Sequence, residues 1–255
     1  MENILEAKKI NKVYEISKGN TQQILRDVDI SIGKGEFVSV MGPSGSGKST
    51  LLYNISGMDK ATSGSVQFCG SELTAMSDDT LSALRLQKMG FIFQQSNLLK
   101  NLNILDNIIL SAYMSKNEPR QIAVRRAKKL MEQTGILMLA DNDITQASGG
   151  QLQRVAICRA LINDPDIVFG DEPTGALNSK ATNEVMDILA EINRKGTAIM
   201  LVTHDAKVAA KTERVLFMAD GVITGEKRMG KYEKESGDIK KRESQLSSWL
   251  LQMGF

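Results

Sequence analysis

The sequence of 255 residues predicts an α/β fold with a parallel-sheet core, an N-terminal antiparallel β subdomain and an inserted α-helical subdomain. Three observations predict it. A glycine- and serine-rich loop at residues 42–49 follows an apolar strand and opens a helix. Residues 98–163 have apolar side chains at helical spacing. Beyond residue 167, helices alternate with unbroken apolar runs, which are typical of strands covered on both faces.

The first half of the chain contains the elements around this loop. Residues 24–32 alternate between apolar and polar side chains in the second half of the segment. A turn at residues 33–35 separates them from the apolar residues 36–41. We expect these segments to form an antiparallel pair that feeds a buried strand. A helix at residues 50–55 and short strands at residues 66–68 and 90–93 follow.

The second half begins with the helical block at residues 98–163. Within it, residues 123–134 are rich in Ala, Lys, Arg and Leu and lack Gly and Pro, which favours a helix. We expect this block to interrupt the core. After it, the pattern predicts strands at residues 167–170, 198–202 and 214–219, with helices at residues 181–192 and 206–211 between them.

Composition excludes several classes of protein. The net charge is only +2, and residues 226–255 supply all of it with seven Lys or Arg and five Asp or Glu, so we expect no nucleic-acid partner. No apolar stretch approaches the roughly 18 residues of a membrane span, and residues 1–10 lack the apolar core of a signal peptide. We therefore expect a cytoplasmic protein that meets a membrane only through a partner.

Cysteine and histidine are scarce. Cys69 and Cys158 belong to no C-x-x-C pair, so we expect two small buried thiols and neither a disulfide nor a zinc site. His204 is the one histidine, which excludes any site that needs two imidazoles.

Residues 42–49 match the phosphate-loop (P-loop) pattern G-x-x-x-x-G-K-[ST]. The glycines let backbone N–H groups and a helix N-terminus face an anion, while Lys48 neutralises phosphate oxygens and Ser49 ligates Mg²⁺. The residues that we expect to bind the nucleotide here are Gly42, Ser44, Gly45, Ser46, Gly47, Lys48, Ser49 and Thr50.

Polar side chains follow two of the later strands. The strand at 167–170 leads to Asp171 and Glu172, and in a P-loop enzyme the first acid holds Mg²⁺ while the second orients or deprotonates the attacking water. The strand at 198–203 presents His204 at its carboxyl end, the edge where open α/β sheets bind ligands. These side chains are predicted to face the nucleotide.

A second anion-binding helix start is expected at Ser148, Gly149, Gly150 and Gln151, which precede the helical residues 152–162. Two phosphate-binding helix ends exceed what one nucleotide needs from one subunit. We therefore expect this end to serve a nucleotide held by another copy. In isolation, the same residues would also fit an ordinary helix cap.

The P-loop, Gln94 after GFIF, ASGGQ, IVFGDE and His204 occur in the order and approximate spacing of the ATP-binding cassette (ABC) ATPases, so residues 4–225 resemble that family. The resemblance implies the P-loop NTPase ABC cassette fold. It also implies that two head-to-tail copies bind two ATP with Mg²⁺, each ATP clamped between the P-loop of one copy and the SGGQ helix of the other. Residues 226–255 would then be a charged tail outside the cassette.

The same resemblance assigns roles to single residues. Tyr14 resembles the aromatic residue that stacks on adenine, with an ordinary strand tyrosine as the alternative. Gln94 resembles the glutamine that reaches Mg²⁺ and the water, although the adjacent Gln95 leaves the register open. Glu172 resembles the general base, Asp171 the acid at the metal, and His204 the residue that contacts the γ-phosphate.

Three positions depart from the family pattern. Ala147 stands where a leucine usually precedes SGGQ, and Gly170 is smaller than its counterparts. Asn178 stands where S-A-L-D has its aspartate, which keeps hydrogen-bonding capacity and loses the charge, so the coupling between half-sites and the ATPase rate are in doubt.

The motifs GPSGSGKSTLL, FQQSNLL, SGGQLQRVAI, DEPTGAL and LVTHD are most similar to ATPases that serve lipoprotein-releasing, macrolide-export and antimicrobial-peptide-resistance permeases. The charged tail ending in WLLQMGF resembles bacitracin- or lantibiotic-type exporters of Gram-positive bacteria. The implied partners are a separate membrane permease and a second copy, with the protein peripheral on the inner face of the cell membrane. A non-transport nucleotide-binding regulator is the remaining alternative.

The tail has an amphipathic pattern. Leu246, Trp249, Leu250 and Met253 lie at i, i+3, i+4 and i+7, one apolar face of a short helix. This face either docks on its own domain or meets the permease or the second ATPase, and the sequence leaves both interpretations open.

Overall fold

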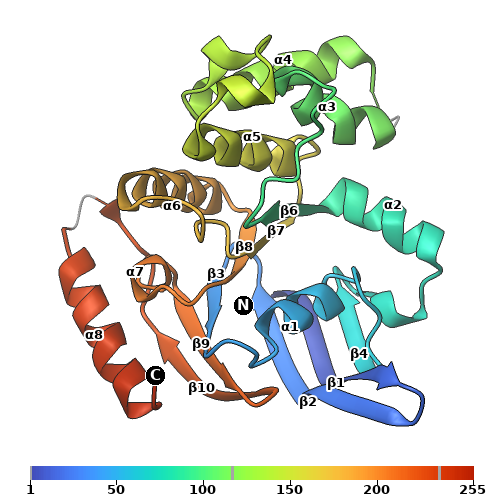
Figure 1. Cartoon of the computed structure of the whole chain (residues 1–255), viewed down its shortest axis with the longest axis vertical. Coiled ribbons are helices and arrows are strands. Elements are labelled where there is room, and N and C mark those ends of the chain that lie inside the picture. Colours follow the sequence, from blue (N-terminus) through green and yellow to red (C-terminus); the bar gives the residue numbers. More distant parts are fainter. Residues whose placement is uncertain (1, 116–117, 235–236) are drawn as a thin grey trace.

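The computed structural model describes residues 2–115, 118–234 and 237–255. In these residues the strands form a four-stranded sheet in the order β2-β1-β4-β5 and a six-stranded sheet in the order β10-β9-β3-β8-β7-β6 (Figure 1). The strands are β1 Asn3–Ser17, β2 Asn20–Gly33, β3 Phe37–Met41, β4 Ser63–Phe68, β5 Ser71–Glu72, β6 Met89–Phe93, β7 Ile167–Asp171, β8 Ala198–Val202, β9 Arg214–Ala219 and β10 Val222–Arg228. The helices are α1 Lys48–Ile55, α2 Asp78–Lys88, α3 Ile104–Ser115, α4 Arg120–Gln133, α5 Gly149–Leu161, α6 Ser179–Arg194, α7 Ala206–Ala209 and α8 Ile239–Gln252.

The six-stranded sheet forms the core. β9, β3, β8, β7 and β6 run parallel, and β10 pairs antiparallel with β9. In β3, Val38 and Val40 pack toward α1 and the four-stranded sheet, whereas Phe37 and Met41 pack toward the helices on the opposite face. Both faces are covered, which explains why these strands are apolar throughout. The predicted α/β fold with a parallel-sheet core is confirmed.

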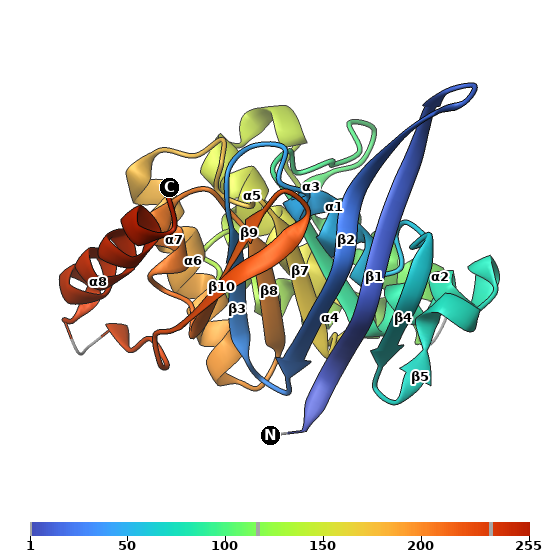
Figure 2. The same cartoon turned by 90° about the horizontal axis from the view of Figure 1, so that it is seen from below.

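Helix α1 lies between the two sheets, as the view from below shows (Figure 2). Its Leu51, Leu52 and Ile55 are fully or almost fully buried and pack in one cluster with residues of both sheets. The helix that follows the P-loop is therefore held by the main hydrophobic core. This burial gives the loop a rigid base.

The expected pairing of residues 24–32 with residues 36–41 is wrong. β2 pairs antiparallel with β1, where Ile30 lies opposite Ala7, while β3 pairs parallel with β8 and β9 in the other sheet. Alternation leaves one face of β2 exposed, which suits a sheet edge, whereas the apolar β3 requires cover on both faces. β1 was not predicted.

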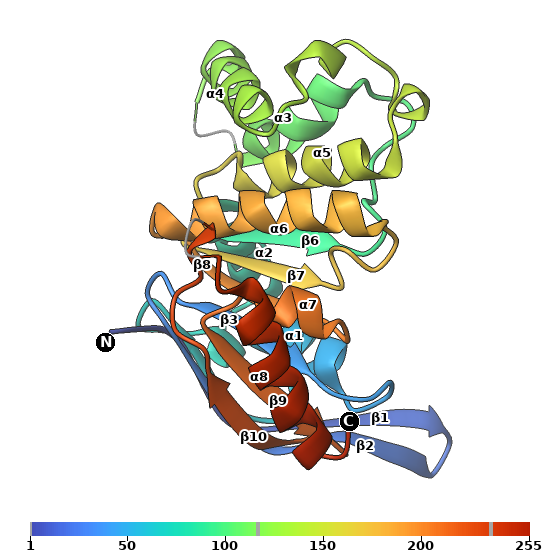
Figure 3. The same cartoon turned by 90° about the vertical axis from the view of Figure 1, so that its left-hand side faces the viewer.

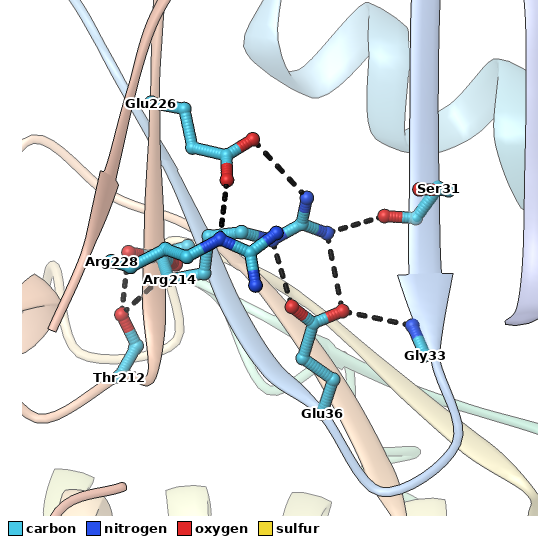
Figure 4. Close-up of polar contacts among 8 residues, drawn as sticks. Ser31, Gly33, Glu36, Thr212, Arg214, Glu226 and Arg228 are labelled. Carbon is cyan, nitrogen blue, oxygen red and sulfur yellow. Dashed lines mark hydrogen bonds and ion pairs between the residues drawn. The ribbon is translucent and has the colours of Figure 1, made fainter. Parts of the chain in front are cut away.

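A buried ion pair joins the two sheets (Figure 4). Arg214 on β9 approaches Glu36 with Nε 2.8 Å from Oε1, and it also donates to the backbone oxygen of Ser31 on β2. The other oxygen of Glu36 accepts a hydrogen bond of 2.8 Å from the Gly33 N–H. Because Glu36 directly precedes β3, this network fixes the turn that connects β2 in one sheet to β3 in the other.

The block predicted to be helical contains α3, α4 and α5, which lie together at the top of Figure 1. They share a cluster of their own that includes Ile108, Ala127 and Val155. α5 also packs against the six-stranded sheet through Ile157 and Ala160. The start of α5 is thus positioned by two cores at once.

The two cysteines differ in environment. Cys158 is buried, and its burial raises the pKa of the thiol to about 12, as expected for a small core residue. Cys69 is exposed, so the prediction that both thiols are buried is wrong for this residue. Cys69 lies with Gly70 in the turn between β4 and β5 and has a φ of 49°, and such a turn keeps its side chain outside the core.

Helix α8 packs on its own domain beside α7 and β9 (Figure 3). Leu246 and Leu250 are buried in a cluster with Met41 and Phe217, and the Trp249 ring meets the Phe217 ring edge-on at 6.3 Å. The apolar face of the tail helix is therefore covered within the chain. This arrangement favours docking of the helix on its own domain over contact with the permease or a second ATPase.

Candidate nucleotide site

The P-loop has the backbone that the motif requires. Gly42 follows the last residue of β3 with a φ of 149°, and a Cβ at this position would lie 1.9 Å from the backbone oxygen of Met218, so only glycine fits. Gly47 caps α1 with a φ of 98°, and no side chain of the described residues bonds the first N–H groups of this helix. The N–H groups at the start of α1 are therefore available to an anion placed against the loop.

Lys48 is held in this loop. Its side-chain nitrogen donates to the backbone oxygens of Gly42 at 2.9 Å and Pro43 at 2.7 Å. Burial lowers the pKa of Lys48, and the charges of Glu172 and Asp171 act in the opposite direction. A phosphate placed against the loop would be a stronger acceptor for this ammonium group than the two carbonyls.

A hydroxyl and a carboxylate meet beside the loop. Ser49 Oγ donates to Asp171 Oδ1 at 2.7 Å, which joins the start of α1 to the end of β7. Hydroxyl and carboxylate oxygens are ligands that suit Mg²⁺, which takes its remaining ligands from phosphates and water. No group of three or more His, Cys, Asp and Glu among the described residues forms a cage for a metal. The pair therefore fits a metal brought with a nucleotide.

Glu172 and His204 form the next pair. His204 Nδ1 lies 3.0 Å from Glu172 Oε1, with 62% of the His204 side chain exposed. Glu172 has a φ of 47°, a conformation uncommon for a residue with a Cβ, and its N–H donates to the backbone oxygen of Val202. This turn aims the carboxylate out of the sheet. Strained backbone of this kind is concentrated at functional sites.

One cleft of about 630 Å³ contains most of these side chains. It is lined by Ile24, Ser44, Gly45, Gly47, Lys48, Ser49, Thr50, Glu172 and His204. The P-loop and the strand ends at Glu172 and His204 thus meet at one cleft. The volume suits a small-molecule ligand.

Gln94 lies beside Glu172. In the parallel pairing of β6 with β7, Phe93 stands opposite Asp171, so the next residues of the two strands emerge side by side. A Cβ on Gly175 would lie 3.0 Å from Gln94 Nε2 and 3.1 Å from Glu172 Oε2, which places both side chains against the same glycine. The structure thus brings Gln94 beside Glu172.

Tyr14 stands on β1 with 40% of its surface exposed. Its hydroxyl donates to Asp59 Oδ2 at 2.6 Å, and Lys12, which binds Asp59 Oδ1 at 2.7 Å, places its ammonium 4.7 Å from the centre of the Tyr14 ring. Burial, followed by Asp59, raises the pKa of Tyr14 to about 12, and a contact with Thr50 opposes this shift. The ring is thus held near the start of α1.

This arrangement, together with comparison of the chain with known protein families, identifies the family. Residues 25–175 match the family model described as ABC transporter. The chain belongs to the ABC transporter family. It is the ATP-binding component, an ATPase.

Similar proteins and solved structures support the same family. The chain is 44% identical to the bacitracin export ATP-binding protein BceA of Halalkalibacterium halodurans. The similarity extends over 221 residues, which are 86% of this chain and 87% of that protein. It is 43% identical to the macrolide export ATP-binding/permease protein MacB of Aggregatibacter actinomycetemcomitans, over 87% of this chain but only 34% of that protein. A dimeric ATP-binding cassette in a post-hydrolysis state with bound ADP and Pi superposes with a TM-score of 0.82 at 37% identity, covering 89% of this chain and 100% of that one.

The second predicted phosphate-binding helix of this ABC ATPase lies away from its own cleft. Ser148 caps α5, and its side chain and that of Gln151 bond each other's backbone N–H groups. Ser148 and Gly149 are exposed, and neither they nor Gly150 and Gln151 line the cleft beside the P-loop. The structure of one chain therefore does not bring the two helix ends together.

The departures from the family pattern have structural explanations at two positions. Asn178 caps α6, with its side-chain oxygen accepting the Ala181 N–H at 2.9 Å, which is the hydrogen bond that an aspartate would make. At Gly170, a Cβ would lie 2.4 Å from Leu201 Cδ2, so a larger residue here would require the Leu201 side chain to move. Ala147 packs against the helical cluster.

Sequence reasoning missed Tyr53. Its hydroxyl donates to Asp171 Oδ2 at 2.6 Å, which is the second oxygen of the carboxylate that Ser49 contacts. The spacing of residues 49 and 53 places them on one face of a helix, but it does not identify Asp171 as their partner. It also missed Asp59, which is 45 residues from Tyr14 and carries no motif.

Proposed function

We propose that two copies of this chain clamp two molecules of ATP with Mg²⁺ in head-to-tail sandwiches and drive a separate membrane permease for resistance to antimicrobial peptides. The observation that supports the catalytic half is the single cleft in which Lys48, Ser49, Glu172 and His204 converge, with Asp171 behind Ser49. The exposed Ser148 helix start supports the sandwich, because it can complete only the site of another copy.

The residues divide the work of hydrolysis. The P-loop N–H groups and Lys48 bind the phosphates, and Gln94 orients the water beside Glu172, the general base. His204, bonded to Glu172, holds the γ-phosphate side of the site, and Tyr14 stacks on adenine. Ser49, Asp171 and Gln94 would hold Mg²⁺, which when bound would neutralise the charge that develops on the phosphates. Catalysis is thus positioning and charge neutralisation.

Replacing Glu172 tests the catalytic assignment. Glu172→Gln keeps the size of the side chain and removes the base, so we expect ATP turnover to fall at least about 100-fold while ATP binding is retained. The variant should accumulate as an ATP-bound dimer, measured by light scattering with and without ATP. Glu132→Gln, on the exposed face of α4, is the matched control and should behave as wild type. Normal hydrolysis by Glu172→Gln would refute the assignment.

The membrane partner is the second part of the proposed function, and fewer observations bear on it. Among the described residues, no helix has the length and apolar character needed to cross a membrane, and the similarity to the bacitracin export protein extends over most of both chains. We propose that the partner is an integral membrane permease on a separate chain, and that this ATPase is peripheral on the inner face of the cell membrane. A macrolide or lipoprotein-releasing permease is the second candidate, because the macrolide exporters match over the same region.

Resistance measurements separate the two candidates. A strain that lacks this ATPase should become more sensitive to bacitracin-type peptides and keep its sensitivity to macrolides. Complementation with Glu172→Gln should fail, and complementation with Glu132→Gln should succeed. Loss of macrolide resistance alone would favour the second candidate. Co-purification of the permease with the tagged ATPase identifies the partner directly.

A further inference from the structure

The carboxylate of Asp171 is held from two sides by one helix. Ser49 and Tyr53 lie four residues apart on α1, and both point toward the end of β7. Ser49 Oγ donates to Oδ1 at 2.7 Å and the Tyr53 hydroxyl donates to Oδ2 at 2.6 Å. Each carboxylate oxygen therefore has its own hydroxyl partner.

The supports of this arrangement are rigid. Asp171 stands between Phe93 of β6 and Val202 of β8 in the sheet, so its backbone is fixed and the rotation of its carboxylate is the main remaining freedom. Tyr53 packs against the main core cluster, which limits the rotamers of its ring. A stiff phenol that bonds Oδ2 therefore determines the direction in which Oδ1 points.

The phenol of Tyr53 is the donor in this contact, because a carboxylate oxygen can only accept. The hydrogen bond engages Oδ2 and leaves Oδ1 as the oxygen that faces Ser49.

We propose that Tyr53 is a positioning residue for the Mg²⁺ site, which holds Oδ2 of Asp171 so that Oδ1 and Ser49 Oγ present a preformed pair of oxygens to the cation. This inference rests on the proposed role of Ser49 and Asp171 at the metal. Tyr53 does not touch the metal or the nucleotide. Groups that bond a metal-facing carboxylate typically change metal affinity about 10- to 100-fold.

Tyr53→Phe tests this inference, because it removes one oxygen and keeps the ring in its place. The concentration of Mn²⁺ that half-saturates the protein–ATP complex, measured by EPR of the bound ion, should rise about tenfold. Binding of a fluorescent ATP analogue in EDTA should stay within about twofold of wild type, and so should kcat at saturating Mg²⁺. Tyr113→Phe, an exposed tyrosine of α3, is the control and should change none of these values.

Three outcomes are decisive. The inference fails if Tyr53→Phe leaves metal half-saturation unchanged, or if it weakens ATP binding in EDTA as much as metal binding. A raised metal requirement with unchanged metal-free binding supports it. Asp171→Asn separates this failure from failure of the proposed function, since a metal requirement unchanged in Asp171→Asn would place the cation elsewhere.

Discussion

At the scale of single residues, the site depends on side chains that each have one or two fixing contacts. Lys48 is held by two loop carbonyls, His204 by Glu172, and Tyr14 by Asp59. Each contact sets the direction of a group before any ligand arrives. A nucleotide therefore meets a largely preorganised cleft, which reduces the entropy lost on binding.

Tyr14 offers a prediction at this scale, because the proposed stacking of its ring on adenine and the bond of its hydroxyl to Asp59 can be removed separately. Tyr14→Ala removes the stacking surface, so we expect the Kd for ATP to rise about tenfold, in line with about 1–3 kcal/mol for the stacking of one base on an aromatic side chain. Tyr14→Phe keeps the ring and loses the bond to Asp59, and its Kd should stay within about threefold of wild type. Isothermal titration with ATP measures both.

The two variants also distinguish the alternatives for Tyr14. Equal losses in both would show that the hydroxyl, rather than the ring, is what ATP binding requires. Wild-type binding in both would make Tyr14 an ordinary strand tyrosine. Tyr113→Ala on the distant helix α3 is the control.

At the scale of elements, α8 is tied to the cassette by a buried arginine. Arg242 is 4% exposed, and its guanidinium donates to backbone oxygens near the end of α7 and in the segment after β10. The acceptors are Ala210, Thr212, Met229, Gly230 and Lys231. Because α7 begins two residues after His204, the helix that carries Arg242 also supports the catalytic edge.

Arg242 therefore has a predicted effect on stability. Arg242→Met leaves several carbonyl groups without their donor, so we expect the free energy of unfolding to fall by about 3 kcal/mol. Urea denaturation followed by circular dichroism measures it. Lys241→Met, at the exposed neighbouring position, should change stability by less than about 0.5 kcal/mol. A stable Arg242→Met protein would show that α8 does not depend on this contact.

Deleting residues 240–255 asks whether the tail also serves a partner. The deletion exposes Met41 and Phe217, so the protein should lose stability. Retained binding of the permease by the truncated chain would assign α8 to its own domain. Lost permease binding in a truncated chain that still folds would assign it to the partner as well.

At the scale of the whole molecule, the proposed sandwich needs a second copy, because the Ser148 helix start does not line the P-loop cleft of its own chain. The P-loop cleft and the Ser148 helix start are on separate bodies, one on the sheet core and the other at the edge of the helical block. A second copy turned head to tail would supply what is missing. Under this proposal, dimerisation is a requirement for catalysis rather than a consequence of it.

Ser148→Arg tests this requirement. The added bulk and charge at the exposed helix start should abolish the ATP-dependent dimer in the Glu172→Gln background while each monomer binds ATP within about threefold of the parent. Light scattering and titration measure the two properties. Ser247→Arg, on the exposed face of α8, is the matched control and should dimerise as the parent does. Dimerisation of Ser148→Arg would refute the sandwich.

The success of sequence reasoning varied with the distance over which each contact acts. The P-loop and the strand ending at Asp171 are local features. A few consecutive residues of the sequence are enough to show the glycine that takes a φ of 98°, or an apolar run before two acids. The contact of Tyr53 with Asp171 joins residues 118 apart, and the placement of β2 with β1 required a choice among partners. The exposed Cys69 likewise depended on where its turn lies.

The sequence by itself determined the family, the phosphate loop, the parallel core and the acids at its edge, because each is encoded in local backbone requirements and in the periodicity of apolar residues. Only the tertiary structure decided that β2 and β3 belong to different sheets, that α8 covers its own domain, and that Tyr53 and Ser49 divide the two oxygens of Asp171. Those outcomes depend on packing between segments distant along the chain. No local pattern specifies such packing.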